Sequence, residues 1–545
     1  MSSSYAHGGS LQPLLGQTIG DNLDGTIARF PDREALVSCH QGARFSYQQL
    51  GAEVDRVARA LLAAGLEHGD RLGIWSPNRF EWVLVQYASA KVGIVLVNLN
   101  PAYRTSELEY ALNQSSCRML VAAPAFKGSD YVAMVEEIRP RCDALERAAF
   151  FDTPSWDELL AGADDVDTED VARRQAATEF DDAINIQYTS GTTGFPKGAT
   201  LSHFNILNNG FFVGEGCRLT ELDRICIPVP YYHCFGMVMG NLGATTHGAC
   251  MVVPAPAFEP DAVLRAVQDE RCTALYGVPT MFIAELEHPA FEQFDLSSLR
   301  TGIMAGSPCP VEVMRRVIDR MHMRDITICY GMTETSPVST QTAADDELER
   351  RVSTVGRVHP HVEVKVIDPA TGAVVGRGEP GELCTRGYSV MLGYWDDPER
   401  TAEAIDRARW MHTGDLALMD ELGYVQITGR IKDMIIRGGE NVYPREIEEF
   451  LYAHPDVADV QVIGVPDERY GEAVMAWVKL REGAVVSDAE LDAFCRDRIA
   501  HFKRPRYWKF VTDFPMTVTG KVQKFRMRDA SIAELGLSEH SLPTP

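Results

Sequence analysis

One run near the middle of the chain constrains its fold and chemistry most: Tyr188-Thr189-Ser190-Gly191-Thr192-Thr193-Gly194-Phe195-Pro196-Lys197-Gly198. Ile184 and Ile186 alternate with polar residues just before it and predict a strand that ends at the run. The glycines allow backbone N–H groups to approach a ligand closely, the hydroxyls add donors, and Lys197 adds a positive charge. These groups suit a polyphosphate, because its oxygens need several converging donors.

The run differs from the common phosphate-binding loop, which has Gly, four residues and then Gly-Lys-Ser/Thr. Pro196 occupies the position of the second glycine, and Gly198 follows the lysine. The alternative is a solvated linker rich in Gly, Ser and Thr. A linker requires neither a preceding strand nor this composition, so a phosphate site is favoured.

Length, charge and cysteine content limit the class of protein. A chain of 545 residues is too long for one hydrophobic core and predicts several domains. Its 52 Lys and Arg against 77 Asp and Glu give a net charge of −25, which argues against nucleic acid or an anionic membrane as a partner. The 12 cysteines have no metal-binding spacing and fit a reducing compartment.

We expect a cytoplasmic protein without an integral membrane segment. The N-terminus lacks the basic and apolar regions of a signal peptide, and the C-terminal Leu-Pro-Thr-Pro is not a peroxisomal signal. Gln86, Lys91 and Gly93 interrupt the most apolar stretch, residues 82–99. That stretch therefore predicts a helix followed by a strand, not a membrane span.

Helical and strand patterns alternate through the first part of the chain. Residues 46–66 carry apolar side chains at helical spacing, and Ser46 with Gln49 forms a capping box. The segments that follow predict strands at 71–75, 94–99 and 118–122, and helices at 82–91 and 106–112. This order predicts an α/β fold with parallel or mixed sheets covered by helices. The acidic, polar segment 163–176 predicts a surface loop.

The pattern of predicted helices and strands changes after residue 350. Short strands at 362–367 and 382–386 lie among Gly and Pro turns and predict a β-rich subdomain of about residues 350–431. After Gly429-Arg430-Ile431-Lys432-Asp433, a compact α+β pattern follows: a helix at 445–452, strands at 460–465 and 473–480, and a helix from Asp488. We therefore expect an N-terminal domain, 1–431, and a small C-terminal domain, 432–545.

The central run resembles the phosphate-binding signature of the adenylate-forming (AMP-binding) superfamily, which includes acyl-CoA synthetases. Five further segments resemble that family, in the family's order. They are Tyr231-Tyr232-His233-Cys234-Phe235-Gly236, Ala305-Gly306-Ser307-Pro308, Tyr330-Gly331-Met332-Thr333-Glu334-Thr335, His412-Thr413-Gly414-Asp415 and Thr519-Gly520-Lys521-Val522-Gln523-Lys524. Their joint order, more than any single motif, carries the resemblance.

The resemblance implies which residues bind the nucleotide. The phosphates would contact Thr189, Ser190, Gly191, Thr192, Thr193, Gly194, Phe195, Pro196 and Lys197. The rest of ATP would contact Gly306, Ser307, Tyr330, Gly331, Met332, Thr333, Asp415 and Arg430. Asp415 can accept hydrogen bonds from both ribose hydroxyls, and the Tyr330 ring can stack on adenine. Glu334 and Thr189 would offer the hard oxygens that Mg²⁺ prefers.

The resemblance also implies the catalytic residues. Lys521 would supply positive charge near the carboxylate and the α-phosphate, although a lysine on such a loop is by itself usually only solvated. His233 would open the acyl pocket, although alone it would more often be a satisfied core histidine. Lys432 matches the hinge about which the family's mobile C-terminal domain swings. Gly438 and Gly439 would then line a narrow pantetheine channel; a plain tight turn is the alternative.

Basic residues gather near the C-terminus, at Lys503, Arg504, Arg506, Lys509, Lys521, Lys524, Arg526 and Arg528, against Asp513 alone. This run is either a solvated basic face or a docking surface for a phosphorylated ligand such as coenzyme A.

The segments Leu99-Asn100-Pro101-Ala102-Tyr103 and Leu201-Ser202-His203-Phe204-Asn205-Ile206 resemble the medium-chain fatty acyl-CoA synthetases. That resemblance implies ATP-dependent ligation of a carboxylic acid to coenzyme A through an acyl-adenylate, with release of AMP and pyrophosphate. ATP, Mg²⁺ and coenzyme A are the implied cofactors and co-substrates.

Several alternatives stay open at this stage. Where amino-acid-activating domains carry an aspartate, this chain has His233 and Cys234, which disfavours an amino acid. Aryl, branched or short thioether acids remain alternatives to a medium-chain acid, and the chain can be a monomer or a homodimer. A non-catalytic nucleotide- or lipid-binding scaffold is the alternative of another class. A scaffold would be free to lose Glu334, Asp415 and Lys521, and all three are present.

Overall fold

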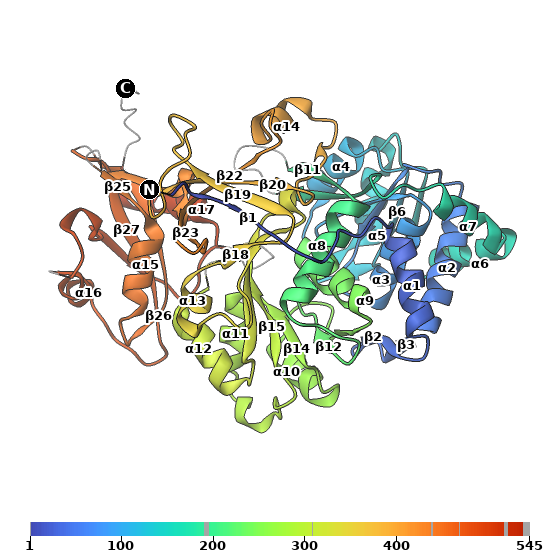
Figure 1. Cartoon of the computed structure of the whole chain (residues 1–545), viewed down its shortest axis with the longest axis horizontal. Coiled ribbons are helices and arrows are strands. Elements are labelled where there is room, and N and C mark those ends of the chain that lie inside the picture. Colours follow the sequence, from blue (N-terminus) through green and yellow to red (C-terminus); the bar gives the residue numbers. More distant parts are fainter. Residues whose placement is uncertain are drawn as a thin grey trace. The chain divides into compact units, whose positions relative to one another are not determined.

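The computed structural model describes the chain except residues 1, 190–195, 308, 438–439, 468, 497, 517–521 and 538–545, and the side chain of residue 441. Backbone contacts divide the chain into two units (Figure 1). The large unit comprises Ala6–Val364 and Cys384–His412, and the C-terminal unit comprises Met1–Tyr5, Lys365–Leu383 and Thr413–Pro545. The predicted domain boundary at residues 431 and 432 stays a prediction.

Two mixed sheets form the framework of the large unit. One has the order β18-β17-β16-β15-β14-β12-β13-β2-β3, and the other has the order β21-β11-β10-β5-β4-β6-β9. The strands of the first are β2 (Glu34–Ser38), β3 (Ala43–Ser46), β12 (Arg224–Cys226), β13 (Cys250–Val253), β14 (Ala274–Gly277), β15 (Thr301–Ala305), β16 (Asp325–Gly331), β17 (Val338–Gln341) and β18 (Arg357–Val358). Those of the second are β4 (Arg71–Trp75), β5 (Val95–Asn98), β6 (Met119–Ala122), β9 (Arg147–Phe150), β10 (Ala183–Thr189), β11 (Lys197–Ser202) and β21 (Gly393–Tyr394).

The central strands of both sheets run parallel, and antiparallel pairs lie toward the edges. A small antiparallel pair, β7 (Ala125–Phe126) and β8 (Ser129–Asp130), stands apart from them. The predicted α/β class with parallel and mixed sheets is confirmed.

Helices pack on these sheets, as Figure 1 shows for α10, α11 and α12 beside β14 and β15. The helices of the large unit are α1 (Ile19–Arg29), α2 (Tyr47–Ala63), α3 (Phe80–Lys91), α4 (Thr105–Gln114), α5 (Tyr131–Ile138), α6 (Pro154–Ala161), α7 (Thr168–Ala176), α8 (His203–Gly216), α9 (Gly243–His247), α10 (Pro260–Asp269), α11 (Pro279–Leu286), α12 (Val311–Arg320), α13 (Leu348–Ser353) and α14 (Pro398–Ala404). Helix α2 begins as predicted, because Ser46 and Gln49 form the reciprocal capping box.

The apolar stretch from Trp82 is helix α3 followed by strand β5, as predicted. Lys91, at the end of α3, is 4% exposed and lies 2.7 Å from Asp24 and 2.6 Å from Asp55. Burial lowers the pKa of Lys91, but hydrogen bonds to the two carboxylates outweigh that effect, and the net shift is upward. The lysine therefore stays charged inside the protein.

No helix among the described residues is long and apolar enough to cross a membrane.

The prediction of a surface loop at residues 163–176 is wrong. Helix α7 occupies Thr168–Ala176, and a short 3₁₀ turn precedes it. Glu169 and Asp170 lie in its first turn, and Arg173 and Arg174 lie in its last, as the helix dipole favours. Val171 is buried and anchors the helix. The sequence pattern did not predict this helix, because its composition is polar and Val171 is its one buried residue.

The C-terminal unit is the predicted small α+β body. Its main sheet has the order β25-β24-β27-β26, with β28 paired to β27. The elements are β23 (Val425–Arg430), β24 (Ile435–Arg437), β25 (Glu440–Val442), α15 (Pro444–Tyr452), β26 (Val457–Asp467), β27 (Gly471–Leu480), α16 (Asp488–Cys495), β28 (Tyr507–Phe510) and α17 (Lys524–Leu535). Ser487 and Glu490 cap α16 as predicted.

A further sheet has the order β1-β19-β20-β22-β23 and corresponds to the predicted β-rich segment. Its other strands are β1 (Tyr5–His7), β19 (Val362–Ile367), β20 (Gly381–Gly387) and β22 (Met411–Met419). The boundary between the two units falls within these four strands.

Candidate active site

The two ends of the central run are held together by strand pairing. Strand β10 ends at Thr189, β11 begins at Lys197, and these two residues are partners in the antiparallel register. Tyr110 donates a hydrogen bond at 3.2 Å to the carbonyl of Pro196, beside the start of β11. The predicted strand before the run is confirmed. Ser190, Gly191, Thr192, Thr193, Gly194 and Phe195 lie outside the described residues.

Glu334 lies beside the end of β10. It sits in a 3₁₀ turn, Thr333–Thr335, that follows β16. Its Oε1 atom accepts hydrogen bonds from the Thr189 hydroxyl at 3.3 Å and from the Tyr394 hydroxyl at 2.9 Å. Glu334 is 5% exposed. A buried carboxylate without a cation needs such donors, because an unsatisfied charge is costly inside a protein.

Tyr394 also faces Lys197. The lysine ammonium lies 4.9 Å from the centre of the tyrosine ring, within the range of a cation–π interaction. Thr189, Lys197 and Glu334, which come from two separate sequence motifs, thus converge around one phenol.

Two glycines shape the backbone where adenine is expected. At Gly331 a Cβ atom would lie 1.7 Å from the carbonyl oxygen of Pro337, so no side chain fits. Gly306 follows β15 with a φ of +91°, in the region that favours glycine. The neighbouring Ser307, Tyr330 and Met332 are half-buried, and Thr333 is buried.

His233 is half-buried rather than enclosed in the core. Its Nδ1 accepts a hydrogen bond from the Phe235 amide at 3.2 Å. A π-helix, Phe235–Leu242, follows directly, and such segments are frequent at functional sites. Every residue of this π-helix is buried.

Buried amides fix the start of the π-helix. The Cys234 thiol donates to Gln187 Oε1 at 3.1 Å, and burial raises the pKa of this thiol, so it remains neutral. The sulfur of Met237 accepts from Gln187 Nε2 at 3.0 Å and from Asn98 Nδ2 at 3.1 Å. Gln187 and Asn98 are partners in the parallel register of β10 and β5. The strand that ends at Thr189 therefore also anchors the segment after His233.

In the C-terminal unit, Asp415 and Arg430 are partners in the register of β22 and β23. Arg430 Nε lies 3.0 Å from Asp415 Oδ1, and the aspartate is 7% exposed. Gly414 has a φ of +70°, and its amide donates to the Glu382 carboxylate at 3.1 Å. This sharp bend fixes the backbone just before Asp415.

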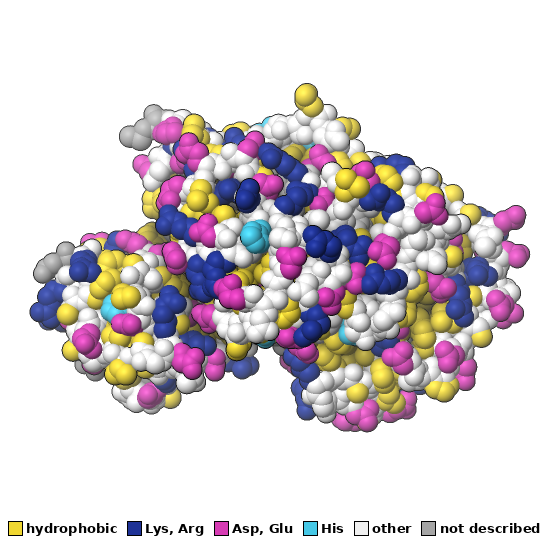
Figure 2. All heavy atoms as spheres, turned by 90° about the horizontal axis from the view of Figure 1, so that it is seen from below, with side chains coloured by type: hydrophobic (Ala, Val, Ile, Leu, Met, Phe, Trp, Pro, Cys, Tyr) yellow, Lys and Arg dark blue, Asp and Glu magenta, His cyan; other side chains and the backbone are white. Residues whose placement is uncertain are grey.

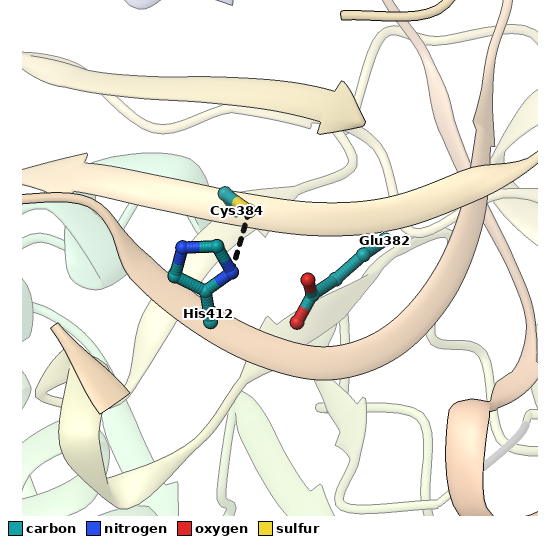
Figure 3. A group of neighbouring side chains, drawn as sticks. All are labelled: Glu382, Cys384 and His412. Carbon is teal, nitrogen blue, oxygen red and sulfur yellow. Dashed lines mark hydrogen bonds between the residues drawn. The ribbon is translucent and has the colours of Figure 1, made fainter. Parts of the chain in front are cut away.

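Figure 3 draws side chains around the same segment, with the Cys384 thiol directed toward the His412 ring. The Cys384 sulfur and His412 Nδ1 are 3.7 Å apart, both within the large unit.

The other predicted residues of the C-terminal unit are only partly described. Lys432 lies in a 3₁₀ turn, Ile431–Asp433, and its side chain is exposed. Gly438 and Gly439, which come between β24 and β25 in the sequence, lie outside the described residues, as does Lys521. Residues on either side of the Lys521 segment approach each other, because Met516 and Val522 form an antiparallel bridge.

Carboxylates neutralise much of the basic C-terminal run. The ion pairs are Lys503–Glu446, Arg504–Asp492, Arg506–Asp467, Lys509–Glu534, Lys524–Glu448 and Arg528–Glu472. On the face shown in Figure 2, Lys and Arg side chains are likewise interspersed with Asp and Glu. Most of the described basic residues of this run are therefore paired with acidic side chains.

One basic pocket nevertheless lies in the C-terminal unit. It has a volume of about 350 Å³ and is lined by Arg437, Asp488, Ala489, Asp492, His501, Arg504, Pro505, Arg506 and Trp508. Arg437 is held in place by donating to the carbonyls of Phe502 and Arg504, at 2.7 and 3.2 Å.

Two family models together match most of the chain. The profile of the AMP-binding enzymes matches residues 23–395, and that of the AMP-binding enzyme C-terminal domain matches residues 446–521. The chain belongs to the AMP-binding enzymes.

Relatives within the family are similar over almost their full length. YngI of Bacillus subtilis (strain 168) is 49% identical over 544 residues, which cover 96% of this chain and 99% of that protein. The mitochondrial medium-chain acyl-CoA ligase ACSF2 of Danio rerio is 45% identical over 557 residues, which cover 98% and 92%.

Among solved structures, ATP-bound MatB from Rhodopseudomonas palustris matches with a TM-score of 0.85 and 31% identity, over 95% of this chain and 99% of that one. The anthranilate CoA ligase AuaEII in complex with anthranoyl-AMP matches with a TM-score of 0.85 and 27% identity, over 96% and 99%. The fold of this chain is therefore similar to that of proteins solved with ATP and with an acyl-adenylate.

Sequence reasoning missed Tyr394 and Gln187. Gln187 lies two residues before Thr189, and strand alternation places both side chains on one face of β10, a signal that was available. Tyr394 is about 200 positions from Lys197 along the chain, and no local pattern links the two.

We predict that Gly331→Ala destabilises the large unit by about 1–3 kcal/mol, because the new methyl group must displace the Pro337 carbonyl. Urea unfolding followed by tryptophan fluorescence measures the effect. The matched control is Gly25→Ala on helix α1, where a Cβ meets no atom within 4 Å. The control is expected to gain about 0.5–1 kcal/mol. Equal stability of the two variants would contradict the prediction.

Proposed function

We propose that this AMP-binding enzyme joins a carboxylic acid, most suitably a medium-chain fatty acid, to coenzyme A in two steps. The acid first attacks the α-phosphorus of ATP, which forms an acyl-adenylate and releases pyrophosphate. The thiol of coenzyme A then attacks the acyl carbon and releases AMP. The observation that carries the proposal is the convergence of Thr189, Lys197 and Glu334, each from a segment that the family shares.

The first step needs preplaced donors and cations, because negative charge builds on the phosphoryl oxygens in the transition state. Lys197 and the loop that begins after Thr189 would hold the phosphates that leave as pyrophosphate. Asp415 would accept hydrogen bonds from the ribose hydroxyls, with Arg430 fixing its carboxylate at 3.0 Å. Tyr330, Gly306 and Ser307 would surround the adenine.

The donor set around Glu334 fits Mg²⁺. A buried carboxylate and a threonine hydroxyl 3.3 Å apart are hard oxygen ligands, which this ion prefers. Glu334 and Thr189 would hold it together with phosphate oxygens. When bound, Mg²⁺ neutralises phosphate charge.

Lys521 would act in the first step by placing its ammonium near the attacking carboxylate and the α-phosphate. His233 would stand at the entrance of the acyl pocket. The buried side chains of the π-helix after it are apolar or small, with the exception of Asn241, and suit an alkyl chain.

The second step would use a different face of the C-terminal unit. A turn about Lys432 would withdraw Lys521 and bring the segment with Gly438 and Gly439 to the acyl carbon, where two glycines leave room for pantetheine. The pocket lined by Arg437, Arg504 and Arg506 would bind phosphates of coenzyme A. Arg504 and Arg506 pair with Asp492 and Asp467, so Arg437, which donates to backbone carbonyls, is the lining residue that most supports an anionic ligand.

A cytoplasmic location is part of the proposal. All 12 cysteines are free, which is typical of a reducing compartment. The expectation that the enzyme is a monomer or a homodimer stays a prediction.

The proposed function is tested with purified enzyme, ATP, Mg²⁺, coenzyme A and a panel of acids from two to 18 carbons, including aryl, branched and thioether acids. Acid-dependent ATP–pyrophosphate exchange reports the first step, and thioester formation reports the whole reaction. We expect both activities to be highest with medium-chain acids. If an aryl or short acid is the best substrate, the assigned acid changes. If no acid supports exchange, the result favours the non-catalytic scaffold.

Lys521→Ala is expected to slow pyrophosphate exchange by roughly 10²- to 10³-fold, the effect of one preplaced electrostatic group. Thioester formation from supplied acyl-adenylate should be much less affected, because the lysine acts only in the first step. Lys509→Ala is the control for loss of a C-terminal lysine. Equal losses in the two half-reactions would argue against separate conformations.

Lys432→Pro is expected to leave pyrophosphate exchange near the wild-type rate and to slow thioester formation from acyl-adenylate. Proline fixes φ, so it would restrict the rotation that the second step needs. Lys432→Ala, which keeps the backbone free, is the matched control. Wild-type rates of both half-reactions in the proline variant would contradict the hinge role of Lys432.

A further inference from the structure

Tyr394 is the contact point of two motifs that are far apart in the sequence. Its hydroxyl donates to Glu334 Oε1 at 2.9 Å, and its ring lies 4.9 Å from the Lys197 ammonium. The residue is only 8% exposed, so both contacts are made inside the protein. Nothing in the motifs around residues 188–198 or 330–335 points to it.

Strand register explains why the ring reaches Lys197. Strand β21 pairs antiparallel with β11, with Tyr394 opposite Ala199. Lys197 is two residues from Ala199, so its side chain leaves the same face of the sheet and lies diagonal to Tyr394. A hydrogen bond from the Trp395 amide to the Gly198 carbonyl at 2.7 Å extends the contact between the two segments.

The position of Tyr394 is fixed from several sides. Its amide donates to the Thr401 hydroxyl at 2.8 Å, and Thr401 lies in helix α14. The Met391 amide, three residues earlier, donates to the backbone carbonyl of Glu334 at 2.9 Å. The segment 391–395 therefore holds both the main chain and the side chain of Glu334, while it pairs with the strand that carries Lys197.

We propose that Tyr394 is a positioning residue for ATP binding: its hydroxyl orients the Glu334 carboxylate, and its ring orients the Lys197 ammonium. The inference rests on the proposed function and adds a residue to the proposed phosphate and metal site. The two contacts are separable, because the hydroxyl donates to Glu334 and the ring faces Lys197. Tyr394 would therefore affect the phosphates and the metal, but not adenine or ribose.

Calorimetric titration of the full-length protein with MgATP and, separately, with AMP tests the inference without acid, coenzyme A or turnover. Tyr394→Phe removes only the hydroxyl and is expected to weaken MgATP binding about tenfold, the effect of one hydrogen bond to a charged group. AMP lacks the β- and γ-phosphates, so its affinity should not change. Tyr388→Phe is the matched control, because that buried hydroxyl meets Asn209 rather than the site.

Tyr394→Leu removes the ring as well and is expected to weaken MgATP binding by roughly two- to fivefold more than Tyr394→Phe. In a Lys197→Met background, this difference between the leucine and phenylalanine variants should vanish, since the partner of the ring is gone. A difference that persists without Lys197 would contradict the role of the ring.

The outcomes separate this inference from the proposed function. Wild-type protein that fails to bind MgATP would contradict the proposed function itself. Wild-type protein that binds MgATP, with unchanged affinity in Tyr394→Phe, would contradict only the role of Tyr394. Equal weakening of MgATP and AMP in Tyr394→Phe would also contradict it, because that result indicates general disruption of the site.

Discussion

The candidate site depends on one constraint: the buried carboxylate of Glu334 must accept hydrogen bonds. Glu334 is almost fully enclosed, and hydroxyls from Thr189 and Tyr394 meet the same oxygen. Neutral donors compensate a buried charge only when they are held at hydrogen-bond distance. The ends of β10, β16 and β21 must therefore keep their positions relative to one another. Contacts within the protein thus organise the polar centre of the large unit, and such preorganisation lowers the ordering that binding requires.

Much of the fold could be predicted from local patterns. The capping boxes of α2 and α16, and the strands at Arg71–Trp75 and Val362–Ile367, lie where the sequence placed them, because caps and apolar alternation are properties of neighbouring residues. Helix α7 was missed for the opposite reason. Its charges are arranged along the helix dipole, but a single valine faces the core, so apolar periodicity was absent.

The candidate site was predictable in its motifs and not in the contacts between them. Thr189, Lys197 and Glu334 stand in recognisable runs, whereas Tyr394 joins them only through the pairing of β21 with β11. Pairing between distant strands is set by the whole sheet, and a single sequence contains no local signal for it. The basic C-terminal run illustrates the same limit. Its charges are visible in the sequence, but the carboxylates that neutralise many of them come from other elements.

The π-helix after His233 has a consequence for how the acyl side of such an enzyme can diversify. A π-helix accommodates one residue more than an α-helix between the same two ends. Deletion of one residue within Phe235–Leu242 would let the segment close as an α-helix while Gln187 and helix α9 keep their places. Because both ends keep their places, the change would be confined to the side chains of this segment. One codon could thus change the side chains on the proposed acyl side, with no change in the sheets that carry Thr189 and Glu334.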